Sequence, residues 1–119
     1  MATKRPGTTP QIQTIEAARE RLGLGYGEIA AAIHTQERTL DQWMKGGATP
    51  PPIFLDRLNG MAKLLRELER TFADADDARA WLRAPNPSLG QATPRELVAA
   101  GEMERVADML YALNAGIPT

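Results

Sequence analysis

Few residues of this sequence have the types and spacing that catalysis or metal binding requires. The chain contains one histidine, His34, and no cysteine, which excludes disulfide scaffolds, cysteine-ligated zinc sites and thiol catalysis. Metal sites and nucleophile–base pairs usually need several such side chains. We therefore expect no catalytic residue, no bound metal and no cofactor, and an enzyme is the class of protein that the sequence favours least.

Two short motifs resemble binding sites only superficially. The aspartates within residues 74–77 could gather around a cation, but carboxylates at the start of a helix satisfy free backbone amides without an ion. The glycines within residues 23–27 have the spacing of a phosphate-binding loop, but no predicted strand precedes them. We interpret the first motif as a helix N-terminus and the second as a helix stop followed by a turn.

Residues 27–46 fit a helix-turn-helix, in which two short helices flank a tight turn and the second helix enters the DNA major groove. Ala30 supplies the small residue where the helices cross. His34, four positions later, occupies the turn position that needs a positive φ, which histidine tolerates better than most residues other than glycine. The apolar positions expected to hold both helices on the core are Ile29, Ile33, Leu40 and Trp43.

The second helix of this motif would present a polar face with features that both favour and oppose DNA binding. Side chains of arginine and glutamine can read base edges, and lysine can bind a phosphate. The acidic Glu37 and Asp41 on the same face would repel phosphates, so useful affinity would need two copies on a palindromic site. The alternative is a helical hairpin that never contacts DNA. The predicted DNA-binding residues are Gln36, Arg38, Thr39, Gln42 and Lys45.

Apolar residues at helical spacing, with almost no alternating β-branched or aromatic residues, predict an all-α protein. Thr35 is the expected N-cap of the third helix, and Gly46 and Gly47 are its expected stop. Asp74 is the expected cap of the fifth helix, and residues 93–96 read as a capping box with proline in the first helical position. Helices are predicted over about 11–22, 27–33, 36–45, 52–72, 74–84, 93–101 and 102–115.

The longest predicted helix carries a narrow apolar seam that is close to a heptad repeat. This seam either packs on the chain's own helices or also contacts a second copy, and the sequence leaves both interpretations open. Its residues are Leu58, Met61, Leu65, Leu68 and Phe72.

Length and composition are those of a globular protein with one domain or two very small ones: 119 residues, 43% apolar and 24% charged. The net charge is −1, with 10 Lys/Arg and 8 Asp/Glu in residues 1–70 but 4 and 7 in residues 71–119. This weak asymmetry suits two different partners. No segment has the length of a membrane helix or the pattern of a signal peptide, so we expect a cytoplasmic protein with a flexible tail over residues 1–10.

Two sets of motifs resemble the Xre/MbcA/ParS antitoxin family, the partners of RES-domain toxins. The resemblance covers roughly residues 13–119, with departures at His34, Glu37 and Asp41. Residues 38–40 followed by Trp43 are similar to the family's recognition helix. The toxin-binding segment is matched in order by Trp81-Leu82, Pro85-Asn86, Leu89-Gly90, Thr93-Pro94, Glu96-Leu97, Gly101, Val106, Leu110 and Gly116.

The resemblance implies a division of the chain. An Xre-like helix-turn-helix region would occupy residues 11–50, a long connecting and dimerisation helix residues 51–72, and a small helical toxin-binding domain residues 73–119. The operator DNA of its own operon and a second copy of the chain would be partners, and the chain would act as an autorepressor.

The resemblance also implies the function of a type II antitoxin that caps the active site of a RES-domain, NAD-degrading toxin with its C-terminal segment. The alternatives are a stand-alone transcriptional regulator without a toxin partner, and a structural dimer or adaptor built on the seam. The toxin-binding residues that the resemblance implies are Met109, Leu113, Asn114, Gly116, Ile117, Pro118 and Thr119.

Overall fold

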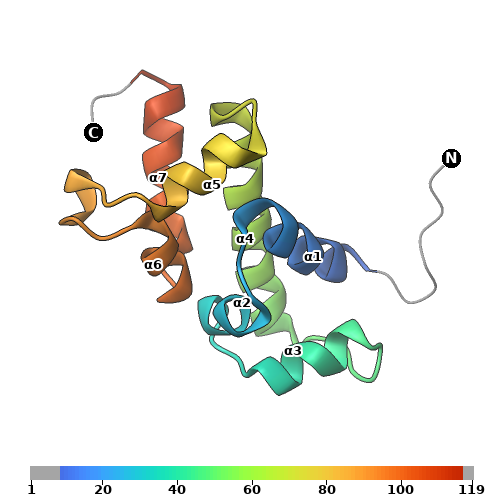
Figure 1. Ribbon diagram of the computed structural model, residues 1–119. Coiled ribbons are helices and arrows are strands. Elements are labelled where there is room, and N and C mark those ends of the chain that lie inside the picture. Colours follow the sequence, from blue (N-terminus) through green and yellow to red (C-terminus); the bar gives the residue numbers. More distant parts are fainter. Residues whose placement is uncertain (1–8, 117–119) are drawn as a thin grey trace, which may run out of the picture.

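A computed structural model describes residues 9–116, and all regular structure in this part of the chain is helical (Figure 1). The predicted all-α class is therefore confirmed, and each predicted helix is present within two residues of its expected start and end. The elements are α1 (Pro10–Leu22), α2 (Tyr26–Ala32), α3 (Glu37–Met44), α4 (Pro52–Thr71), α5 (Ala75–Arg83), the 3-10 turn η1 (Pro87–Leu89), α6 (Pro94–Ala99) and α7 (Met103–Asn114).

The first helix begins earlier than the predicted tail allows. Thr9 is the N-cap of α1 and accepts a hydrogen bond at Oγ1 from the backbone N–H of Ile12, at 3.2 Å, and Pro10 occupies the first helical position. Proline suits this position because its missing N–H would have no partner there. Thr9 and Pro10 therefore belong to the folded unit, and residues 1–8 of the predicted tail lie outside the described part.

The turn between α2 and α3 differs from the prediction by one residue. Gln36, and not Thr35, is the N-cap of α3, and its side chain makes no capping hydrogen bond. The backbone N–H of Thr35 instead donates to the carbonyl of Ala30, at 2.9 Å, so Thr35 belongs to the turn. His34 has φ of 61°, so its predicted positive φ is confirmed.

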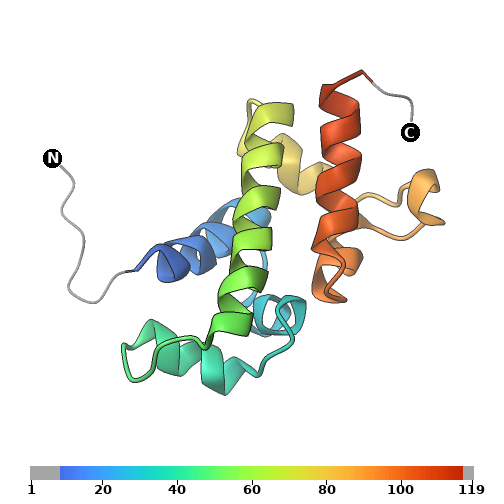
Figure 2. The same cartoon turned by 180° about the vertical axis from the view of Figure 1, so that it is seen from behind.

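Helix α4 lies between α1 on one side and α7 on the other (Figures 1 and 2). Four residues of its apolar seam are buried, with exposed fractions of 6% or less, and Phe72 is partly buried against Trp81, whose ring centroid is 5.9 Å away. The seam thus packs on the chain's own helices, and a contact of α4 with a second copy stays a prediction.

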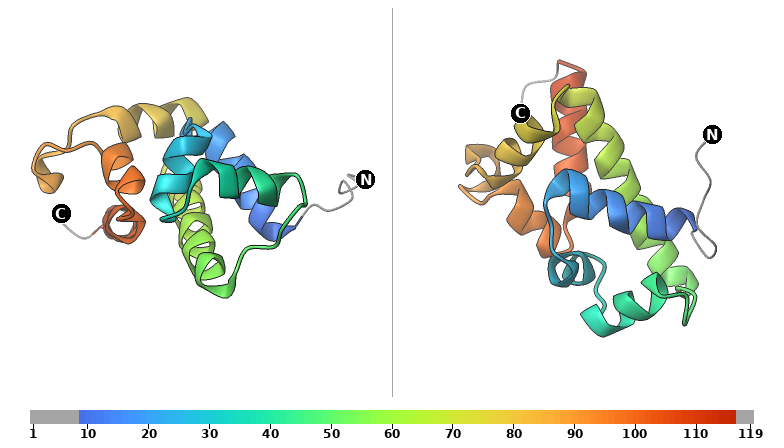
Figure 3. Two further views of the ribbon diagram at one scale, coloured as in Figure 1. Left: turned by 90° about the horizontal axis from the view of Figure 1, so that it is seen from below. Right: turned by 45° about the vertical axis from the view of Figure 1, so that its right-hand side comes forward.

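The last third of the described chain packs beside α4. Asp74 caps α5 by accepting from the backbone N–H of Asp76 at 2.8 Å, and Thr93 and Glu96 form the predicted capping box, with both hydrogen bonds at 3.1 Å. The turn η1 was not predicted, because it is only three residues long and the prolines at 85 and 87 were interpreted as the end of the preceding helix. The loop that carries η1 and helix α3 lie at opposite ends of the molecule (Figure 3).

One hydrophobic cluster joins all these helices. It runs from Ile15 in α1 through Leu40 in α3 and Met61 in α4 to Leu110 in α7, all with exposed fractions of 0%. The cluster crosses the boundaries near residues 50 and 72, so the three predicted segments share a single core. No helix in residues 9–116 is long and apolar enough to cross a membrane.

Candidate functional site

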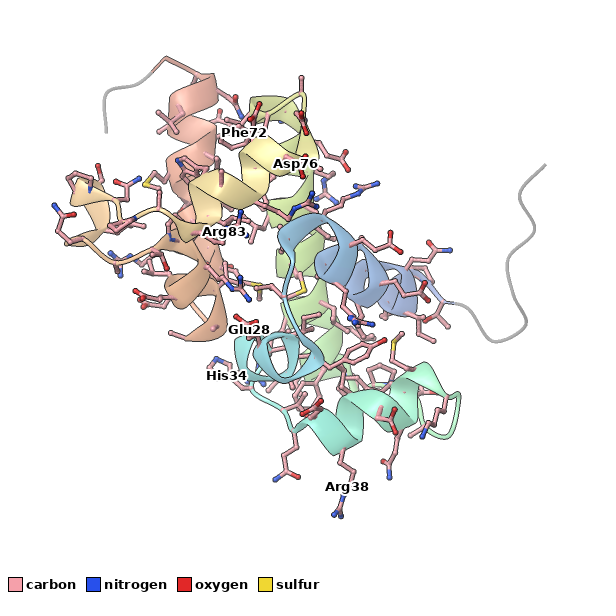
Figure 4. All side chains as sticks on the ribbon, viewed as in Figure 1. Glu28, His34, Arg38, Phe72, Asp76 and Arg83 are labelled. Atoms are coloured by element: carbon pink, nitrogen blue, oxygen red, sulfur yellow. The ribbon has the colours of Figure 1, made fainter. Side chains whose placement is uncertain are left out.

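The exposed face of α3 carries most of the side chains that were predicted to bind DNA. Leu40 and Trp43 are buried with exposed fractions of 0% and 2%, which turns the polar positions outward. Arg38 points away from the rest of the molecule in Figure 4. Of the five predicted DNA-binding residues, Thr39 is half-buried and the exposed ones are Gln36, Arg38, Gln42 and Lys45.

Charge on this face is partly cancelled. The ammonium of Lys45 lies 2.9 Å from the carboxylate of Asp41, one helical turn earlier. The hydrogen bond to Asp41 raises the pKa of Lys45, so the lysine stays charged but already has a partner. A phosphate would have to compete with Asp41 for Lys45, which lowers the net attraction of the face for DNA.

The turn that orients α3 is held by backbone and side-chain contacts. Besides the hydrogen bond from Thr35 to Ala30, the His34 N–H donates to the carbonyl of Ala31 at 3.1 Å. Nη1 of Arg57 in α4 donates to the carbonyl of Ile33 at 3.0 Å, which satisfies a carbonyl at the end of α2. These contacts fix the angle between the two helices of the motif.

Two contacts join the helix-turn-helix to the C-terminal helices. The guanidinium of Arg95 in α6 donates to both carboxylate oxygens of Glu28 in α2, at 2.8 and 2.6 Å. The ring of His34 lies against Gly101, between α6 and α7, so closely that a Cβ at position 101 would be 2.5 Å from Cε1 and Nε2. The sequence did not predict either contact, because pairs 67 residues apart leave no periodic signal.

The C-terminal turns of α7 form the second candidate surface. Leu113 is 45% exposed although it continues the predicted apolar stripe, while Met109 is only 9% exposed. Tyr111 is 57% exposed; the sequence prediction missed it because it lies off the stripe. Because Leu113 and Tyr111 are two positions apart, their side chains lie on different sides of the helix.

Asn114 is exposed, but its side chain contacts α4. Its Nδ2 donates to Oγ1 of Thr71 in α4 at 2.8 Å and lies 3.5 Å from Oε2 of Glu67. Gly116 ends the described chain with φ of 71°. Ile117, Pro118 and Thr119, which were predicted to contact the toxin, lie outside the described residues.

Within residues 9–116, no group of three or more histidine, aspartate or glutamate side chains is arranged to hold a metal ion. The aspartates of residues 74–77 act as the sequence suggested, since Asp74 caps α5 and Asp76 pairs with Arg79.

Comparisons with known proteins agree with the arrangement of the helices. Residues 67–116 match the C-terminal toxin-binding domain of the Xre/MbcA/ParS antitoxins. The chain is 30% identical, over 93% of its own length and 97% of theirs, to the mycobacterial cidal antitoxin MbcA of Mycobacterium tuberculosis and of Mycobacterium bovis. It also resembles a chain in the crystal structure of the M. tuberculosis MbcT–MbcA toxin–antitoxin complex, with a TM-score of 0.68 and 28% identity over 94% of this chain and 100% of that one.

Proposed function

Because this chain belongs to the Xre/MbcA/ParS antitoxin family, we propose that it neutralises a RES-domain toxin that degrades NAD. The observation that carries the proposal is the match to this family over nearly the whole chain, together with the likeness to a chain of a toxin–antitoxin complex. The chain would act by binding alone, without a catalytic residue, a metal or a cofactor.

The proposed toxin-binding surface is the C-terminal end of α7 with the residues that follow it. The exposed Leu113 would contact the surface of the toxin, and residues 116–119 would enter its active-site cleft. The proline at 118 fixes one backbone dihedral before binding, so ordering this segment costs less entropy. A segment that occupies the cleft excludes NAD without any chemistry by the antitoxin. The residues assigned to this surface are Met109, Leu113, Gly116, Ile117, Pro118 and Thr119; Asn114, which was also expected here, hydrogen-bonds to Thr71 within the chain.

We further propose that α3 binds the promoter of the chain's own operon. The exposed Arg38 and Gln42 would read base edges, with Gln36 and Thr39 beside them, and Lys45 would contact a phosphate. Because this face also carries Glu37 and Asp41, one copy would bind weakly. A homodimer on a two-fold symmetric operator would supply the missing affinity.

Coexpression tests the antitoxin function. The neighbouring open reading frame is expressed in a heterologous cytoplasm with and without this chain, and cellular NAD is followed. We expect NAD to fall when the neighbour is expressed alone and to stay level with the chain present. A chain that lacks residues 116–119 should protect less. A steady NAD level with the neighbour alone would contradict the proposal.

A second candidate function, a transcriptional regulator without a toxin partner, is favoured by the exposed polar face of α3 alone. The two functions differ in what accompanies the chain from its native host. Copurification with a RES-domain protein supports the antitoxin. A chain that copurifies with no partner, but shifts its upstream DNA in a gel and loses this shift on Arg38→Ala, supports the regulator.

A further inference from the structure

Glu67 in the last turns of α4 is the one charged side chain that is buried in the described part of the chain, with an exposed fraction of 6%. Removing a carboxylate from water is costly unless hydrogen bonds replace the lost solvation. A well-packed apolar residue could fill such a position without that cost. The retained charge therefore requires an explanation from its neighbours.

Two side chains lie at this carboxylate, and a third residue, Thr71, links Asn114 to the Glu67 backbone. Nη1 of Arg70 donates to Oε1 at 3.3 Å, and Nδ2 of Asn114 lies 3.5 Å from Oε2. The same Asn114 amide donates to Oγ1 of Thr71 at 2.8 Å, and Thr71 Oγ1 donates to the backbone carbonyl of Glu67 at 2.8 Å. We name Glu67, Thr71 and Asn114 the polar latch.

The polar latch joins the C-terminal ends of two helices that lie side by side (Figure 2). The last turn of a helix has carbonyls without intrahelical partners and frays easily. In α7 this turn carries the exposed Leu113, and Gly116 after it has a positive φ of 71°. Any rotation of this turn would change the direction in which Leu113 points.

Directional hydrogen bonds resist such rotation better than apolar packing does, because apolar contacts tolerate sliding while a hydrogen bond weakens steeply when its angle changes. A buried polar group can in this way select one geometry at a cost in stability. The latch lies at an exposed helix end, since Asn114 itself is exposed.

We propose that Asn114 is a positioning residue, which acts through Thr71 and Glu67 to hold the last turn of α7 in the orientation that presents Leu113 to the toxin. This inference rests on the proposed antitoxin function. It assigns to Asn114 a role inside this chain, in place of a direct contact with the partner.

Four full-length variants test the latch by their affinity for the cognate RES-domain toxin. Asn114→Ala and Thr71→Val each remove the hydrogen bond between α7 and α4, and we expect each to weaken binding about tenfold. Thr71→Ser keeps the hydroxyl and should restore affinity. Thr14→Val is the matched control, since Thr14 makes the same backbone hydrogen bond one turn back in α1, to the Pro10 carbonyl at 3.0 Å, and should bind normally.

Two further measurements separate positioning from a direct contact or a general loss of stability. Amide hydrogen exchange should quicken at Ala115 and Gly116 in Asn114→Ala, while the core amides of α4 stay protected. The affinity losses of Asn114→Ala and Thr71→Val should not add in the double variant, because both remove one interaction.

Each outcome decides the inference. Additive losses, or a loss in Asn114→Ala with normal affinity in Thr71→Val, would show that Asn114 contacts the toxin directly and would overturn it. Normal affinity in both variants would overturn it while the antitoxin function stands. A wild-type chain that does not bind the toxin at all would overturn the proposed function as well.

Discussion

The guanidinium of Arg95 donates two hydrogen bonds, of 2.8 and 2.6 Å, to the carboxylate of Glu28, which lies 67 residues earlier in the sequence. This pair joins the first helix of the helix-turn-helix to α6 of the toxin-binding region. Bidentate pairs of this kind are stronger and more specific in geometry than single ion pairs. The side chains are about one third exposed, so solvent screens part of their attraction.

Removing this pair should loosen the junction without unfolding the chain. We expect Glu28→Gln to lower the free energy of unfolding by about 1 kcal/mol, because a neutral amide loses the charge-assisted part of both hydrogen bonds. Urea unfolding at pH 7 measures the change. Glu20→Gln, at an exposed position of α1, is a control for the loss of one negative charge, and an equal effect of both variants would contradict a specific role for the pair.

The same pair predicts a pH dependence. The hydrogen bonds from Arg95 hold the pKa of Glu28 below its ordinary value in the folded chain. A lowered folded-state pKa gives stability that is fully present above the unfolded-state pKa, about 4.3, and is lost as the pH falls through the folded value. The difference in unfolding free energy between the wild type and Glu28→Gln should therefore be constant near neutral pH and shrink in acid. A difference that grows in acid would contradict this assignment.

Gly101 has a φ of +87°, and an added Cβ would meet the His34 ring at 2.5 Å. We expect Gly101→Ala to lower the free energy of unfolding by about 2 kcal/mol, from backbone strain and from displacement of the ring. In a His34→Gly background the ring is gone, and only the strain of about 1 kcal/mol should remain. Thermal or urea unfolding of the four chains measures both parts. Equal penalties in the two backgrounds would show that the ring does not contribute.

Asp41 limits the affinity of α3 for DNA if the proposed operator binding holds. Asp41→Asn removes one negative charge from the face and releases Lys45 from its ion pair. We expect tighter binding to the operator, by several-fold, and a salt dependence steeper by about one phosphate contact. Titrations at several salt concentrations measure both. The doubly impaired variant Asp41→Asn with Lys45→Ala is the control and should show no steeper salt dependence.

Local patterns were sufficient to predict the helices and most of the core. The spacing of Ile29, Ile33, Leu40 and Trp43 predicted four side chains that are all buried, because a short amphipathic helix has only one face that can bury apolar groups. The capping box at Thr93 was equally clear, since both of its hydrogen bonds join residues three apart. The positive φ of His34 was also predicted, because His34 lies four positions after the small residue Ala30.

Contacts between distant segments could not be predicted in this way. The pairing of Glu28 with Arg95 and of Asn114 with Thr71 depends on how α6 and α7 lie against α2 and α4, which no local period records. Thr35 was wrong as an N-cap because its backbone N–H hydrogen-bonds within the turn. This hydrogen bond depends on how α2 packs against α3. Leu113 continued an apolar stripe in the sequence, but no other helix of the described chain covers it, and it is 45% exposed.

The core shared by all the helices has a consequence for how proteases would degrade the chain. Opening α4 far enough to admit a protease would uncover side chains that bury parts of both α1 and α7. A first cut in this helix would therefore end operator binding and toxin neutralisation in one event, and the cell would have no intermediate in which one proposed activity outlives the other.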